Sequence, residues 1–404
     1  MSASKIFALL EPFTLGNSIS LRNRICMGSM TRNRCIDSNK PTEASVKYYA
    51  DRAKDGTGLI VAEGTFIYLA GTDWVHAPVM FTEKHADAWN KVTDAVHEEG
   101  GTIFFQPWHA GRVQNENMPM LKENNYPVLA PSKIPVSGGS YRLLEGKPGH
   151  TNNITEIEDA KEIIDQYRNS VRLAKKAGFD GIEILAQGGY LLHNFLLSRS
   201  NQRTDKYGGS TENRCRFVLE VVDAIVEVWG PNAVGIKICP TDNLADSAIS
   251  YAEISETYTY LIQQLVVRGL CFINLTRRGC DLGPSQYPVD SFVPSRPAGT
   301  ELPPSYEPLH EFGPMIKFPG SKTRLMVNHE YTVVEAERLL QEGKIDLICF
   351  GRPFIYNPDV ITRIKRDIPF ATNDRGAHVS YGPYKDPNEN YNDWSYVAKN
   401  TEEN

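Results

Sequence analysis

Residues 178–196 read GFDGIEILAQGGYLLHNFL, and this stretch decides how the rest of the chain is interpreted. A turn at Gly178 leads into the short apolar run 181–185, which predicts a buried parallel strand. The run ends in the small residues of 186–189, where a backbone can come close to a ligand. Tyr190 then stands just past the end of the strand. We therefore look for the same unit, a short buried strand with a functional end, along the whole chain.

Apolar runs of this length recur at regular intervals. We expect strands near residues 24–27, 58–62, 102–106, 181–185, 234–239, 271–275, 324–327 and 346–350. Helical patterns fall near 42–54, 84–99, 157–177, 211–229, 252–268 and 332–342, with Ser210 as the N-cap of the fourth. Eight strands that alternate with helices predict an α/β fold of the (β/α)8 TIM-barrel type. The alternative is a doubly wound sheet, which is less favoured because no glycine fingerprint follows the first strand.

The predicted domain organisation is one barrel with two long loops. We expect a single barrel domain over residues 1–370 and a C-terminal tail over residues 371–404, which is polar and aromatic. The connections 107–155 and 276–322 are long and rich in turn-forming residues. Long βα loops on a barrel usually form lids or the walls of a pocket.

Composition excludes several classes of protein. The net charge of −6 argues against a basic face for nucleic acid or anionic lipid. There is no apolar stretch that could cross a membrane and no signal-peptide core, so a cytoplasmic protein is expected. The seven cysteines are odd in number and lack metal-type spacing, which favours reduced structural thiols and no metal site. We expect a monomer or homodimer that acts on a small molecule.

In a barrel the active site lies at the carboxyl ends of the strands. The first predicted strand is followed by GSMTR at 28–32 and the second by EGTF at 63–66. The third ends in QPWHAGR at 106–112, and the eighth ends in FGRPF at 350–354. Several of these residues can donate or accept hydrogen bonds, and the glycines allow a ligand to approach the backbone.

These strand ends, together with RTDKYGGSTENR at 203–214, resemble the Old Yellow Enzyme family of flavin-dependent ene-reductases. The resemblance runs from about residue 9 to residue 358. It implies FMN as cofactor, NAD(P)H as reductant and an activated alkene as the small-molecule substrate.

The resemblance assigns a role to each strand-end residue. Thr31 matches the threonine bonded to the flavin C4 carbonyl, and Gly64 matches a small residue packed against the isoalloxazine. Gln106 matches the glutamine that bonds the pyrimidine edge, and Trp108 matches a wall of the substrate pocket. Lys237 stands where the family usually has an arginine beside flavin N1 and O2. Lysine keeps the positive charge but loses the two-pronged contact.

The phosphate end of the site departs from the family in part. Gly351 and Arg352 match the residues that bind the cofactor phosphate. After the seventh strand, however, Asn328-His329-Glu330 stands where the family has two small residues. Glu330 would repel the phosphate unless it turns outward, and His329 could compensate as a donor. We favour a cradle made by backbone amides, with both side chains facing solvent.

The fourth strand carries the largest departure. The family places a pair of carbonyl-binding side chains where this chain has Leu185 and Gly188, while the proton-donating tyrosine is retained as Tyr190. Loss of one such donor costs about 3–4 kcal/mol of transition-state stabilisation. Gln187 or His109 could replace the pair, although Gln187 is expected to point away from the pocket.

His193 is not favoured as a replacement donor. It lies in the segment LLHNFL at 191–196, where a packed or capping histidine is expected.

The resulting hypothesis is an FMN-dependent oxidoreductase that acts on an activated alkene of a bulky specialised metabolite. Hydride comes from reduced FMN and the proton from Tyr190, a phenol that is protonated at neutral pH. Two alternatives stay open: a repurposed barrel that catalyses an isomerisation or cyclisation, and a non-catalytic ligand-binding relative. A bound flavin would favour the first reading over the last.

Overall fold

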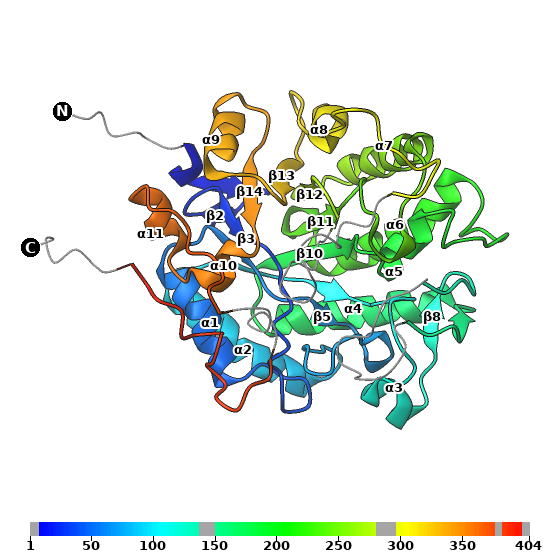
Figure 1. The fold of residues 1–404 in the computed structure, drawn as a ribbon, viewed down its shortest axis with the longest axis horizontal. Coiled ribbons are helices and arrows are strands. Elements are labelled where there is room, and N and C mark those ends of the chain that lie inside the picture. Colours follow the sequence, from blue (N-terminus) through cyan, green and yellow to red (C-terminus); the bar gives the residue numbers. More distant parts are fainter. Residues whose placement is uncertain (1–7, 137–149, 280–295, 376–381, 398–404) are drawn as a thin grey trace, which may run out of the picture.

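The computed structural model describes residues 8–136, 150–279, 296–375 and 382–397. Eight parallel strands close into a barrel with helices around it (Figure 1). In order around the barrel they are β10 (Gly181–Ala186), β11 (Val234–Ile238), β12 (Phe272–Thr276), β13 (Arg324–Asn328), β14 (Leu347–Phe350), β3 (Ile25–Met27), β4 (Leu59–Val61) and β6 (Ile103–Phe105). Each overlaps one of the predicted strand regions, with ends that differ by a few residues at most. The predicted (β/α)8 barrel is therefore confirmed, and closure excludes the open doubly wound sheet.

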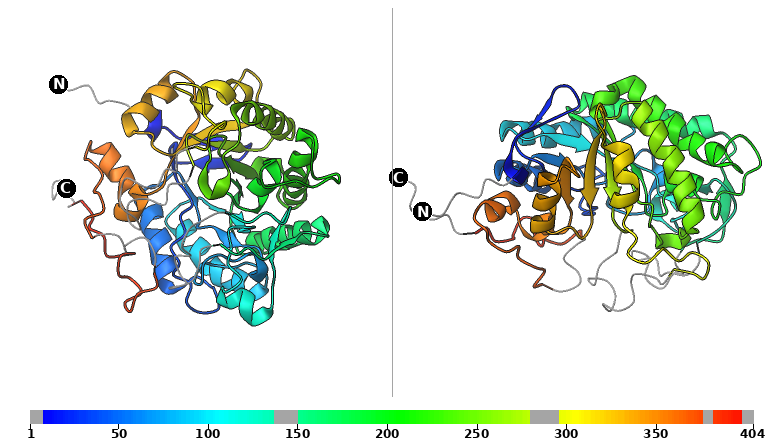
Figure 2. Two further views of the ribbon diagram at one scale, coloured as in Figure 1. Left: turned by 45° about the vertical axis from the view of Figure 1, so that its right-hand side comes forward. Right: turned by 90° about the horizontal axis from the view of Figure 1, so that it is seen from above.

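The helices cover the outside of the barrel (Figure 2). The larger ones are α1 (Glu43–Lys54), α2 (Glu83–Glu98), α4 (Ala160–Lys176), α6 (Thr211–Trp229), α7 (Tyr251–Val267), α8 (Pro308–Ile316) and α9 (Val333–Gln341). Shorter helices are α3 (Pro119–Asn124), α5 (Leu191–Leu196), α10 (Pro353–Tyr356) and α11 (Val360–Lys365). The Ser210 hydroxyl accepts a hydrogen bond from the Asn213 amide, which confirms its role as the N-cap of α6. Helix α8 was not predicted, because it contains Pro314.

Strand β10 shows how the two faces of the barrel wall differ. Ile182 and Ile184 are buried in the hydrophobic cluster between barrel and helices. Glu183 and Leu185 lie on the other face, toward the barrel interior, because successive side chains of a strand point in opposite directions. The interior at this depth is therefore partly polar, which is unusual for a buried layer and marks the floor of a site.

One end of the barrel is closed by the hairpin of β1 (Phe13–Leu15) and β2 (Ile19–Leu21). Leu15 and Leu21 pack with Cys26, Phe272 and other interior residues of the barrel. A cavity can therefore open only toward the carboxyl ends of the strands, which is where barrel enzymes have their active sites.

The long loops carry structure of their own. Residues 107–155 include β7 (Pro107–Trp108), which pairs with β5 (Thr65–Phe66), and β8 (Val128–Ala130), which pairs with β9 (Ile154–Glu156). Residues 276–322 include α8. The loop segments 137–149 and 280–295 lie outside the described residues. The parallel pair of β5 and β7 extends the barrel wall beyond β4 and β6 and places Trp108 above the barrel.

The described part of the C-terminal tail packs on the barrel. Tyr391 is fully buried, and its ring stacks on Tyr48 of α1 with centroids 4.2 Å apart. The Arg32 guanidinium donates a hydrogen bond of 3.2 Å to the carbonyl of Asn390. The tail thus contacts the segment that follows β3, next to the predicted cofactor residue Thr31. The boundary between barrel and tail at residue 370 stays a prediction.

Two further observations concern the cysteines and the length and polarity of the helices. Within the described ranges, every cysteine is buried and free, as expected for structural thiols, while Cys280 lies outside them. None of the helices in these ranges is long and apolar enough to span a membrane. The cytoplasmic location and the oligomeric state stay predictions.

Candidate active site

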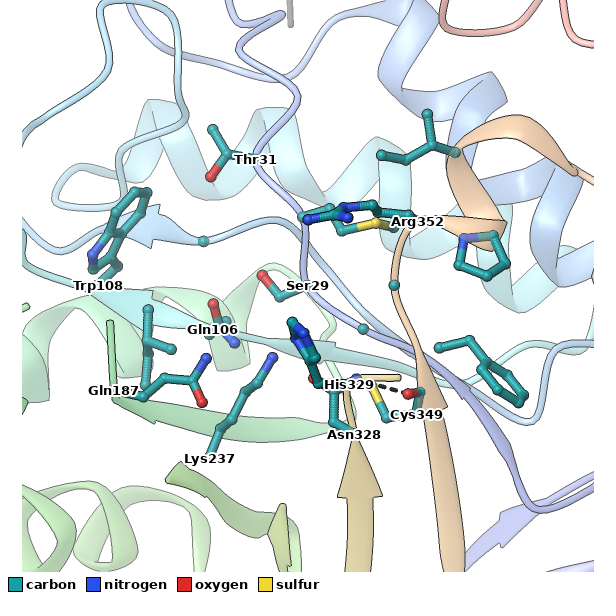
Figure 3. Close-up of a pocket in the computed structure, with 18 of the residues that line it drawn as sticks. Ser29, Thr31, Gln106, Trp108, Gln187, Lys237, Asn328, His329, Cys349 and Arg352 are labelled. Carbon is teal, nitrogen blue, oxygen red and sulfur yellow. Dashed lines mark hydrogen bonds between the residues drawn. The ribbon is translucent and has the colours of Figure 1, made fainter. Parts of the chain in front are cut away.

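A cavity of about 400 Å³ lies at the carboxyl ends of the barrel strands (Figure 3). It is lined by all but one of the site residues predicted from the sequence, namely Thr31, Gly64, Gln106, Trp108, Leu185, Tyr190, Lys237, His329, Gly351 and Arg352. Gly188 is the predicted residue that does not line it. Side chains from seven of the eight barrel strands or the loops after them thus meet in one place. No group of three or more His, Cys, Asp or Glu side chains in the described ranges could hold a metal ion.

Gln106 is held in one orientation by a buried carboxylate. Its Nε2 donates a hydrogen bond of 2.8 Å to Glu183 Oε1, and Asn274 Nδ2 donates one of 2.9 Å to Glu183 Oε2. Because an ionised carboxylate only accepts hydrogen bonds, the Gln106 amide must present its nitrogen to Glu183 and its oxygen elsewhere. Sequence analysis missed Glu183 and Asn274. The sequence signal that could have found them is the carboxylate of Glu183 within an otherwise apolar strand, because a buried charge needs hydrogen-bonding partners.

Lys237 brings a positive charge into the cavity. It lies on β11 opposite Leu185 of β10, and its side chain is 8% exposed. In the ranges that the structure describes, its ammonium group has neither a hydrogen-bond nor an ion-pair partner. A buried cation without a counter-ion is unfavourable. The cavity is therefore suited to a ligand that offers negative charge or carbonyl oxygens at this point.

The part of the cavity wall that contains Trp108 is aromatic. The Trp108 ring stacks on Phe66 with centroids 4.2 Å apart and meets the Tyr190 ring edge-on at 4.7 Å. A Cβ on Gly64 would lie 2.8 Å from the Trp108 ring and 3.3 Å from Gln106 Oε1. A side chain at this position would therefore clash with both residues, and glycine lets the Trp108 ring and the Gln106 amide line the cavity side by side. A ring and an amide arranged in this way suit a planar heteroaromatic ligand.

Arg352 lies across the cavity from Trp108 (Figure 3). A Cβ on its neighbour Gly351 would meet only the Met30 side chain, at 3.7 Å, so the backbone there is open to a ligand. Glycine and arginine after the last strand form a suitable phosphate site. The cavity therefore has a planar aromatic end and a cationic end.

His329 and Glu330 both have left-handed backbone, with φ of 72° and 58°. This conformation explains why small residues suit the position, because a left-handed residue other than glycine costs about 1–2 kcal/mol. The Arg277 guanidinium holds the turn by donating a hydrogen bond of 3.2 Å to the Glu330 carbonyl. The Glu330 side chain is 50% exposed and lies 3.4 Å from Arg278, whereas His329 is 17% exposed. Glu330 therefore faces solvent in part while still contributing to the cavity wall.

We expect two substitutions at Glu330 to separate charge from backbone strain. Glu330→Gln and Glu330→Gly both remove a negative charge near the phosphate site, so each should lower the FMN dissociation constant roughly twofold to fivefold. Only Glu330→Gly relieves the left-handed backbone, so it should unfold at a higher temperature than Glu330→Gln when FMN is absent. Flavin fluorescence titration and thermal unfolding measure the two effects. Unchanged dissociation constants in both variants would show that the carboxylate does not act on the phosphate.

The end of β10 differs from the sequence-based expectation. Gln187, which we expected to point away, lines the cavity. The strand alternation counted from Leu185 gives this orientation, because residues 183, 185 and 187 share one face. The left-handed turn begins only at Gly188, so Gln187 is still in register with Leu185. Gly188 is turned aside, with φ of 76° and its N–H donating a hydrogen bond of 2.6 Å to Asp242 Oδ2.

Gly188 also has no room for a side chain. A Cβ there would lie 2.7 Å from the Tyr190 ring. A side chain at this position would therefore displace the Tyr190 ring.

His109 and His193 have structural roles. His109 does not line the cavity; its Nδ1 accepts a hydrogen bond of 3.0 Å from the Gly111 amide, and burial lowers its pKa to about 3. His193 Nδ1 accepts a hydrogen bond of 3.1 Å from the Gly189 amide, and its Nε2 lies 3.1 Å from the Tyr258 hydroxyl. The prediction that His193 is a packed residue is confirmed.

Comparisons with known proteins agree with this site. The model of the NADH:flavin oxidoreductase / NADH oxidase family matches residues 8–277. The chain is 32% identical to the probable flavin mononucleotide-dependent alkene reductase of Leishmania infantum, over 98% of this chain and 100% of that protein. It is 30% identical to 12-oxophytodienoate reductase 1 of Oryza sativa subsp. japonica, over 100% and 97% of the two chains.

Solved structures give the same result. Morphinone reductase superposes with a TM-score of 0.80 at 31% identity, and the alignment covers 98% of each chain. The Old Yellow Enzyme homologue from Zymomonas mobilis superposes with a TM-score of 0.81 at 28% identity, over 96% of this chain and 100% of that one.

The cavity fits FMN on its own chemistry. The oriented Gln106 amide suits the pyrimidine edge of the isoalloxazine, the unpartnered Lys237 suits its electron-rich edge, and Arg352 suits the phosphate. The chain belongs to the NADH:flavin oxidoreductase / NADH oxidase family, and it is an FMN-dependent oxidoreductase of the Old Yellow Enzyme type.

Proposed function

We propose that the protein reduces a hydrophobic, activated alkene, such as that of a bulky specialised metabolite, at the expense of NAD(P)H. The observation that carries this proposal is the meeting of Tyr190, Lys237 and Gln106 in one cavity at the carboxyl end of the barrel. A relative whose structure is described as a complex of morphinone reductase with tetrahydroNAD supports a nicotinamide reductant.

The residues have distinct parts in this reaction. FMN, when bound and reduced, would supply the hydride. Lys237 and Gln106 hold the electron-rich edge of the cofactor, and Lys237 stabilises negative charge there. Tyr190 gives a proton to the carbon next to the activating group, and its position as the N-cap of α5 fixes the start of its side chain.

The apolar wall near Tyr190 supports a hydrophobic substrate. Leu185 belongs to a cluster of buried residues that includes Trp74, Trp108 and Phe66. Burial of substrate carbon against such a wall contributes about 25 cal/mol for each Å² of apolar surface. A polar alkene would gain little from this wall.

A second candidate is isomerisation or cyclisation without net reduction. Leu185 favours it, because this side chain cannot donate a hydrogen bond to a carbonyl that accumulates charge during hydride addition. A non-catalytic ligand-binding role is the third possibility, and it is disfavoured by the retained Tyr190.

Product analysis distinguishes these possibilities. Purified protein with FMN, NADPH or NADH and 4-phenyl-3-buten-2-one should form the saturated ketone, with one nicotinamide oxidised for each molecule of product in the absence of oxygen. This aryl enone should turn over faster than 2-cyclohexenone, because its phenyl ring can pack on the apolar wall. Loss of the enone without oxidation of NAD(P)H would identify an isomerase or cyclase instead, and an unchanged enone would contradict both.

A further inference from the structure

Gln187 places a carboxamide in the cavity beside the apolar wall. Its side chain follows directly after β10 and is 4% exposed. Its Oε1 accepts a hydrogen bond of 2.9 Å from the hydroxyl of Thr276, a buried residue at the end of β12. Because the amide oxygen is held by this hydroxyl, the amide nitrogen is directed into the cavity (Figure 3).

The Gln187 nitrogen is an available donor. It carries two N–H groups, and within the described ranges it has no hydrogen-bond partner. Because Gln187 lines the cavity, these N–H groups can donate to an acceptor on a bound ligand. A single polar group on an otherwise apolar wall is also the usual means of orienting a small molecule in a pocket.

The backbone donors that follow Gln187 at the end of β10 are already engaged, and the Lys237 ammonium opposite Leu185 is assigned to the cofactor. The Gly188 N–H donates to Asp242, and the Gly189 N–H donates to His193 Nδ1. His109 is buried outside the cavity lining. Gln187 is therefore the donor that this strand end offers to a substrate.

We propose that Gln187 is a catalytic residue that donates a hydrogen bond from Nε2 to the activating carbonyl oxygen of the substrate. The role rests on the proposed alkene reduction. As hydride forms a bond to the β carbon, the electrons of the C=C bond shift toward the carbonyl, and its oxygen gains negative charge. Gln187 stabilises that oxygen, and the α carbon then takes its proton from Tyr190. The products are a saturated carbonyl compound and, after two electrons from NAD(P)H have been consumed, the oxidised nicotinamide.

This assignment defines a substrate class. The Gln187 amide takes over the role of the carbonyl-binding side chains that the family has at the positions of Leu185 and Gly188. It offers one side chain with two N–H groups in place of two side chains, and it suits alkenes that are conjugated to a carbonyl group.

The test compares two oxidants of the same reduced protein. Protein with bound FMN is reduced with dithionite and mixed in a stopped-flow instrument with 4-phenyl-3-buten-2-one or with oxygen, which needs no carbonyl donor. Gln187→Met keeps the length of the side chain and removes the donor, and Gln187→Glu keeps the shape and replaces the donor with an acceptor. Both should slow oxidation by the enone roughly tenfold to a hundredfold and leave oxidation by oxygen unchanged.

Two controls accompany these variants. Gln341→Met makes the same replacement on the outer helix α9 and should change neither rate. Thr276→Val removes the hydroxyl that orients the amide, so it should slow the enone reaction by a smaller factor than Gln187→Met.

The outcomes separate this role from the function on which it rests. Equal enone rates in wild type and both Gln187 variants overturn the donor role alone. Loss of FMN from these variants, or equal slowing with enone and oxygen, overturns it too, because Gln187 would then serve the cofactor. A wild-type protein that reduces no enone contradicts the proposed function and the donor role with it.

Discussion

Leu185→His should raise the turnover of 2-cyclohexenone by roughly a hundredfold, because one added donor to a developing oxyanion contributes at least about 2.7 kcal/mol of transition-state stabilisation when it is well placed. Leu185 lines the cavity, and its neighbour on β11 is Lys237. The nearby positive charge disfavours protonation of the new imidazole, which would keep it neutral and able to donate from one nitrogen. Steady-state rates with NAD(P)H under anaerobic conditions measure the gain.

The matched control is Leu185→Phe, which adds a ring of similar size without an N–H group. It should bind FMN normally and show no gain with 2-cyclohexenone. If Leu185→His binds FMN and is no faster than Leu185→Phe, the missing donor at residue 185 does not limit enone reduction. Gly188→Asn should not add to the gain, because its Cβ would lie within 3 Å of the Tyr190 ring.

The barrel could be predicted from the sequence because its strands are short and separated by clear helical periods. The eight expected strand regions each overlap one strand of the closed barrel. Helix α8 could not be predicted in this way, because Pro314 interrupts its helical pattern. The pairs β5–β7 and β8–β9 depend on contacts between distant segments of the chain. Two-residue strands such as β5 leave no periodic signal.

The position of the site could also be predicted, but its hydrogen bonds could not. Thr31, Gln106, Lys237 and Arg352 lie on or just after four different strands, and barrel closure brings all four to one cavity. The contact of Gln106 with Glu183 joins residues 77 positions apart, so only the folded structure reveals it.

The end of β10 was the point at which sequence reasoning failed. Strand alternation places Gln187 on the same face as Leu185, toward the cavity, and it places Gly188 on the opposite face. Leu185 and Gly188 were both expected to line the site, and a regular strand cannot satisfy both expectations. The left-handed turn at Gly188 breaks the alternation, and the sequence does not show where the break occurs.

Tyr190→Phe should have the largest effect on the chemical step. General acids contribute roughly 100- to 10,000-fold to rates, and Tyr190 is the proposed acid. Phenylalanine keeps the ring that packs edge-on against Trp108, so the wall of the cavity and the FMN content should not change. The loss should appear in the reaction of the reduced protein with enone, not in the reaction with oxygen, because no carbon is protonated there.

The measurement that tests the account most directly is the single-turnover oxidation of reduced wild-type and Tyr190→Phe protein by 4-phenyl-3-buten-2-one. The account predicts that the wild type forms the saturated ketone as its flavin is oxidised, and that Tyr190→Phe does so at least about a hundredfold more slowly with the same FMN content. Equal rates in the two proteins would contradict the role of Tyr190. A wild-type flavin that stays reduced in the presence of the enone would contradict alkene reduction itself.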